Sequence, residues 1–171
     1  SSVDRYQQKV VELLNSMDFK AGDAQVVSTS PELSPLGKLK QTLDHFEDLR
    51  IIGIDENRSH RPDDSKQLMD VYLRLSVDPP SDWAECFDED WSRQWYTMLR
   101  RASIVGGCVV IHCVPDEIER HHLPRLQASV EAANRSYRNR LELQISNESR
   151  RIAKEAGERD SLRDLNQRLG F

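Results

Sequence analysis

The sequence predicts an α+β fold: two N-terminal helices, a four-stranded antiparallel sheet with the chain order β-β-α-β-β-α, and a long charged C-terminal helix. Two observations carry this prediction. Towards both ends of the chain, apolar residues recur at steps of three and four, which is the period of an amphipathic helix. Between residues 50 and 115, alternating or short apolar segments are joined by loops, which is typical of antiparallel hairpins. We expect helices to cover at least one face of the sheet.

Residues 1–49 are predicted to form a helical hairpin that packs on the core; a separate partner-binding arm is the alternative. Ser34 followed by Pro35 is typical of a helix start, because serine caps free backbone N–H groups and proline fits the first turn. The apolar seam of the first helix is Val3, Tyr6, Val10, Leu13 and Met17, and that of the second is Leu36, Leu39, Leu43 and Phe46, ending near Leu49.

Residues 50–141 are predicted to be the α+β core, which opens with a hairpin. The short apolar segment "RIIGID" (50–55) is the first strand, and the polar segment 56–66 is a loop. The second strand runs from Met69 to Val77, where apolar and polar side chains alternate strictly. This alternation gives the strand one buried and one polar face.

A short acidic helix is predicted after Pro79 and Pro80, with Ser81 as its N-cap. Its aromatic residues recur every four positions, so we expect them to form a stripe in the core, while its carboxylates face water. The stripe consists of Trp83, Phe87 and Trp91.

The second hairpin is predicted from segments 95–105 and 108–113. Gly106 and Gly107 suit its two-residue turn, because both positions can take positive φ. This register places Val105 opposite Cys108 and Arg101 opposite His112.

Two helices follow, a short one in "DEIERHH" (116–122) and a long one that opens at Pro124. Residues 142–171 are predicted to be a charged helical extension that either spans solvent or forms half of a coiled coil with another chain. Gly157 is expected to mark a break, because glycine costs a helix about 1 kcal/mol. The stripe of the long helix is Leu126, Val130, Ala133, Tyr137 and Leu141, and a last seam is Leu162, Leu165 and Leu169.

The stretch 106–126 is rich in cysteine and histidine but predicts neither a metal nor a catalytic site. On a strand, Cys108 and His112 share a face but lie about 13 Å apart, and Cys113 points to the opposite face. Zinc ligands must converge on one point at 2.0–2.3 Å. A composite of Cys113, Asp116 or Glu117, and His121 is the remaining arrangement. We therefore predict no metal ion and no cofactor.

One face of the sheet is predicted to bind a partner or a ligand. If the two hairpins share a sheet, Tyr72, Arg74, Arg101 and His112 lie on one surface that mixes polar and apolar side chains. Arginine, tyrosine and histidine among apolar residues are typical of an interface. The alternative is that the N-terminal helices cover this face and that acids pair with its arginines.

These features favour a non-enzymatic interaction or scaffold protein of the bacterial cytoplasm that forms a homo-oligomer or binds another protein. Three cysteines without framework spacing favour a reducing compartment, and no apolar run reaches the length of a membrane span. An enzyme or small-ligand module with a site assembled from distant residues is one alternative; Cys113, His112 and His121 are its first candidates. A nucleic-acid-associated protein is another, disfavoured by the net charge of −5. Its candidate contacts are Arg74, Arg101, Arg135, Arg138, Arg150 and Arg151.

Overall fold

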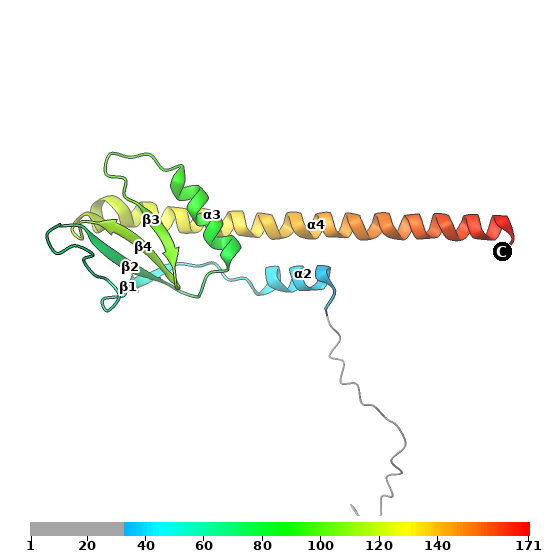
Figure 1. The fold of residues 1–171 in the computed structure, drawn as a ribbon, viewed down its shortest axis with the longest axis horizontal. Helices are drawn as coiled ribbons and strands as arrows, with labels where there is room; N and C mark the ends of the chain where they lie inside the picture. Colours follow the sequence, from blue (N-terminus) through cyan, green and yellow to red (C-terminus); the bar gives the residue numbers. More distant parts are fainter. Residues whose placement is uncertain (1–32) are drawn as a thin grey trace, which may run out of the picture. The chain divides into compact units, whose positions relative to one another are not determined.

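The computed structural model describes residues 33–171, in which helices cover one face of a four-stranded sheet and a further short helix lies beside the long C-terminal one (Figure 1). The strand order is β1-β2-β4-β3, and all neighbouring strands are antiparallel. The α+β prediction is confirmed, with its antiparallel sheet and long C-terminal helix. The predicted helix of residues 3–17 lies outside the described residues, and the division into three regions stays a prediction. The elements are α2 (Pro35–His45), β1 (Ile51–Ile54), β2 (Met69–Leu75), α3 (Ser81–Ser92), β3 (Ala102–Val105), β4 (Cys108–Cys113), the π-helix η1 (Ile118–His122) and α4 (Leu123–Leu169).

Helix α2 begins as predicted, because the Ser34 hydroxyl accepts a hydrogen bond from the Gly37 N–H at 3.1 Å. It packs on α4, where the rings of Phe46 and Tyr137 meet edge to face with centroids 4.7 Å apart. It ends at His45, earlier than the prediction near Leu49. A tertiary contact explains the difference: the buried Asn134 side chain accepts from the Leu49 N–H at 3.0 Å and donates to the Leu49 carbonyl at 2.9 Å.

The hairpin of β3 and β4 has the predicted register, with Val105 opposite Cys108 and with positive φ at both turn glycines. However, β3 begins only at Ala102, so the prediction of a strand from residue 95 is wrong. The Arg100 carbonyl accepts a hydrogen bond from the Trp91 indole at 3.1 Å. This contact holds the chain before β3 away from the sheet ladder.

Helix α3 buries its aromatic stripe, as predicted, with Trp83 and Phe87 fully inaccessible. The Trp83 indole donates to Asn134 on α4 at 2.8 Å, so one amide ties α3, α4 and the segment before β1 together. Ser81 is the first helical residue and Pro80 is the N-cap, which corrects the prediction of a serine cap.

Helix α4 divides at Leu141, its last buried residue. We call residues 123–141 the core half and residues 142–169 the projecting half, which continues past the sheet and α3 (Figure 1). The predicted break at Gly157 is wrong, since the helix is continuous to Leu169. Good helix formers surround this glycine, and Lys154 pairs with Glu158 across it, so a cost of about 1 kcal/mol is tolerated. The buried residues are Leu126, Ser129, Val130, Ala133, Asn134, Tyr137 and Leu141.

Candidate functional site

The four residues predicted to bind a partner share one face of the sheet. Strand pairing sets Asp70 opposite His112 and Arg74 opposite Cys108, with Tyr72 between them. The His112 N–H donates to the Arg101 carbonyl at 3.0 Å, which places Arg101 at the matching position beside β4. Alternate residues of the same strands, such as Val71 and Ile111, are buried in the core on the opposite face. We call the face that carries Tyr72, Arg74, Arg101 and His112 the outer sheet face.

The loop between β1 and β2 folds over part of the outer sheet face. The Arg58 guanidinium lies 4.6 Å from the centre of the Tyr72 ring and donates to the Gly106 carbonyl at 2.8 Å. His60 pairs with Asp70 through two backbone hydrogen bonds of 3.0 and 2.8 Å. Sequence reasoning missed these loop residues because a loop has no period. The available signal was that these loop residues come shortly before the strand that carries Asp70 and Tyr72 on its outer face.

Helix α2 packs on α4, so within residues 33–171 the expected covering of the outer sheet face by an N-terminal helix is absent. Among residues 33–171, Arg58, Arg74 and Arg101 make no ion pair, and the alternative that the first N-terminal helix supplies acids to this face lies outside the described residues. Asp70 is the carboxylate on this face, and it lies 2.6 Å from His112 Nδ1. Among the named residues of this face, three arginines thus lie with one carboxylate.

The cysteine and histidine cluster forms a packed network rather than an open site. Burial raises the pKa of the Cys113 thiol to about 11, so it stays protonated and weakly nucleophilic at neutral pH. The predicted composite named His121, but it is His122 that is fully buried, between the Tyr96 hydroxyl at 2.9 Å and Glu117 at 3.2 Å. Adjacent helical side chains diverge by about 100°, and only the packing decides which of the two points inward.

Glu117 is the centre of this network. Arg100 donates two hydrogen bonds to its carboxylate, at 3.0 and 2.8 Å, and these lower the pKa of Glu117 to about 2. Within the described residues every buried side-chain nitrogen and oxygen has a partner. The network therefore fastens the segment before β3 to η1 and leaves no unpaired group for a substrate.

No three histidine, cysteine, aspartate or glutamate side chains among residues 33–171 are arranged to hold a metal ion. Asp70 lies between His60 and His112, with closest distances of 3.9 and 2.6 Å, but these three side chains do not form such a group.

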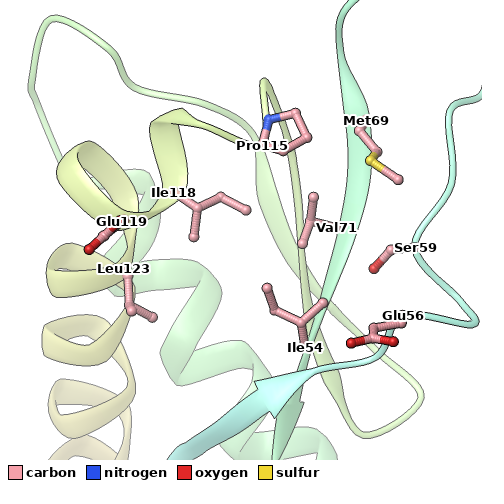
Figure 2. Close-up of a pocket in the computed structure, with 9 residues that line it drawn as sticks. All are labelled: Ile54, Glu56, Ser59, Met69, Val71, Pro115, Ile118, Glu119 and Leu123. Atoms are coloured by element: carbon pink, nitrogen blue, oxygen red, sulfur yellow. The ribbon is translucent and has the colours of Figure 1, made fainter.

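An apolar cavity of about 470 Å³ opens beside the edge of the sheet (Figure 2). Ile54 and Val71 form the sheet side, and Ile118 and Leu123 face them from η1 and α4. The Ser59 hydroxyl beside it is already bonded to the Asp55 carbonyl and the Tyr72 N–H. The cavity thus suits an apolar group and offers few polar contacts; sequence reasoning missed it because three separate segments, 54–59, 69–71 and 115–123, contribute to it.

The projecting half of α4 exposes large apolar side chains to solvent. From Leu141 to Leu169 the helix extends about 42 Å at 1.5 Å per residue. No residue in this half is buried. Exposed fractions are 41% for Ile152, 65% for Leu162, 41% for Leu165 and 59% for Leu169.

Comparison with known proteins gives no relative: no family model, no curated protein and no solved structure matches the chain. Among the described helices, none combines the length and the apolar character that a membrane span requires.

Proposed function

We propose that the chain is a non-enzymatic interaction protein of the cytoplasm that associates with itself through the projecting half of α4. The observation that carries the proposal is the exposure of Ile152, Leu162, Leu165 and Leu169 on a helix that extends about 42 Å beyond the core.

The physical argument concerns what stabilises this half of the helix. Helices in proteins gain most of their stability from burying an apolar face. In the projecting half, local ion pairs take that role: Arg151 bonds to Glu148 and Glu155, and Arg163 bonds to Asp160. Each pair contributes only about 0.2–0.5 kcal/mol. Pairing with a second copy would bury the exposed leucines and supply the missing apolar contacts.

The chemistry of the core also supports a non-enzymatic protein. Cys113 is a buried thiol with a raised pKa, and Tyr96, His122 and Glu117 bind one another. A cysteine nucleophile needs a base in reach and access for substrate.

Light scattering over a concentration series tests this proposal on the full chain and on a variant that lacks residues 146–171. We expect the mass of the full chain to rise with concentration to twice the monomer value and the truncated chain to remain monomeric. A full chain that is strictly monomeric would refute the proposal, and so would a truncated chain that still dimerises.

The apolar cavity favours a second candidate function, the binding of a small apolar ligand. Its volume lies within the range of ligand pockets, about 300–1,000 Å³. An anilinonaphthalene dye should increase in fluorescence with the native protein, and Ile54→Glu should reduce the increase by introducing a charge at the mouth. Because Ile54 is 46% exposed, this variant should keep its fold. Equal fluorescence for both proteins would exclude this cavity.

A further inference from the structure

In the projecting half of α4, a set of residues repeats every seven positions, and a helix exposed to solvent on all sides has no use for such a repeat. Positions at alternating steps of three and four form one seam when a helix joins a left-handed coiled coil. We call this set of positions the α4 seam. Its apolar members lie towards its two ends and are Ile145, Ile152, Leu162 and Leu169.

The polar members of the α4 seam determine which pairing is acceptable. They are Glu148, Glu155, Arg159 and Asn166. In a parallel pair of identical helices, each seam residue faces its own copy. That arrangement would bring Glu148, Glu155 and Arg159 each against a like charge, which opposes association.

An antiparallel pair centred level with Gly157 removes these conflicts. Ile152 then faces Leu162 of the second copy, and Ile145 faces Leu169. Glu155 faces Arg159, so the central layers each hold two opposite charges. Apolar residues meet apolar residues in this alignment, and charges at the centre are complementary.

Shifting the antiparallel alignment by one heptad introduces a mismatch in either direction. A shift in one direction sets Ile152 against Glu155. A shift in the other direction sets Arg159 against Leu162. Both alternatives bury a charge beside an apolar side chain, which is costly. The pattern therefore selects a single register.

We propose that two copies of this chain pair antiparallel through their α4 seams, with a two-fold axis level with Gly157. This inference rests on the self-association proposed above and specifies its geometry. Leu162 and Leu169 are 65% and 59% exposed, so the seam is accessible within the described unit. Helix α2 packs on α4 on the sheet side of the α4 seam (Figure 1), and Ile145 is half-buried. The layer of Ile145 and Leu169, which is farthest from the two-fold axis, therefore lies beside the start of α2.

Charge reversal on the full chain tests the central layers. Glu155→Arg should oppose Arg159, and Arg159→Glu should oppose Glu155, so each should weaken the dimer by about tenfold or more. The double variant should restore the affinity, because it exchanges the two charges. Asp164→Arg and Arg150→Glu make the same charge changes at positions that point away from the seam, and they should leave the affinity unchanged. A dimer in which the double variant stays weak would overturn the antiparallel register.

Spin labels provide an independent measurement of direction. The three native cysteines are buried, so labels should attach to introduced ones at the exposed positions Ser161→Cys and Gln167→Cys. In the antiparallel pair, labels at 161 are offset by about 12 Å along the axis and labels at 167 by about 30 Å. In a parallel pair, both sites would give the same short distance, and this result would overturn the inference while leaving self-association intact.

The concentration series separates this inference from the proposal beneath it. A full chain that stays monomeric at every concentration would refute both. A dimer that survives removal of residues 146–171 would place the interface elsewhere.

Discussion

The two halves of α4 belong to one continuous helix but are stabilised in different ways. The core half has its apolar stripe against the sheet and α3, and its buried polar residue Asn134 makes three hydrogen bonds. The projecting half has no buried residue and instead carries ion pairs between residues three or four apart. Continuity of a helix therefore says little about whether its residues contribute to the folding of the core or remain available to a partner.

The largest expected effect is in the core half. Leu126→Ala should lower the free energy of unfolding by about 2–5 kcal/mol, because Leu126 is fully buried and its loss leaves a cavity. Urea denaturation measures the change. The matched variant in the projecting half, Leu162→Ala, should change the stability of the monomer by less than about 0.5 kcal/mol. Similar losses in both variants would mean that the projecting half is packed in the monomer.

Asn134→Ala should cost about 1–3 kcal/mol or more, because it leaves the Trp83 indole and both backbone groups of Leu49 without their partner. Thermal unfolding measures this loss. Asn166→Ala, in the projecting half, is the control and should leave the melting temperature of the monomer nearly unchanged. A stable Asn134→Ala protein would show that water replaces the amide.

The next largest expected effect is a difference between the two halves in how their ion pairs respond to acid. In the folded protein the pKa of Glu117 is about 2, below its ordinary value of 4.5, because Arg100 bonds to the carboxylate. The folded state thus keeps this group ionised where the unfolded state protonates it. Its stabilisation is complete above about pH 4.5 and is lost as the pH falls towards 2.

The measurement is the free energy of unfolding of the native protein and of Glu117→Gln between pH 6 and 2. The variant should be less stable at pH 6, and the difference should shrink as the native protein loses its ion pair. Glu148→Gln is the matched control, since the pKa of Glu148 is also lowered, by the exposed Arg151. Its effect should be small and should disappear in 1 M salt. If the free energies of unfolding of the native protein and Glu117→Gln differed by the same amount at every pH, the Arg100 ion pair would not be the cause of the lowered pKa.

The smallest effect is expected at Gly157, where an added Cβ would meet no atom within 4 Å. Gly157→Ala should stabilise the projecting half locally by about 1 kcal/mol, seen as slower amide exchange between residues 150 and 165. Global unfolding should hardly change, because the core does not contact this residue. The dimer affinity should also be unchanged, since position 157 points away from the α4 seam. A loss of affinity would place Gly157 at an interface.

Much of the fold follows from local pattern, and the errors share one cause. The alternation in β2, the glycine turn before Cys108 and the aromatic stripe of α3 are properties of neighbouring residues, and all three are confirmed. The end of α2 and the start of β3 were predicted wrongly. In both places a side chain from another element, Asn134 or Trp91, bonds to the backbone and overrides the local preference.

The candidate site was also predictable only where it depends on a local pattern. The register between β3 and β4 follows from the turn, so the placement of Arg101 beside His112 could be worked out from the chain alone. The position of Arg58 over Tyr72 could not, because it depends on the course of a loop without a period. The apolar cavity of Figure 2 was equally beyond reach, since Ile54 and Leu123 meet only after the sheet and helices have assembled.

By itself, the sequence determined the period of each element, the turn at Gly106 and Gly107, and the complementarity of the α4 seam with itself. Each of these depends on spacings along one segment, which the backbone geometry of a helix or strand converts directly into a face. Only the tertiary structure decided that His122 rather than His121 is buried, that Arg74 and Arg101 have no acidic partner among residues 33–171, and that Leu141 is the last buried residue of α4. Those facts depend on contacts between distant segments, and such contacts exist only once the core has formed.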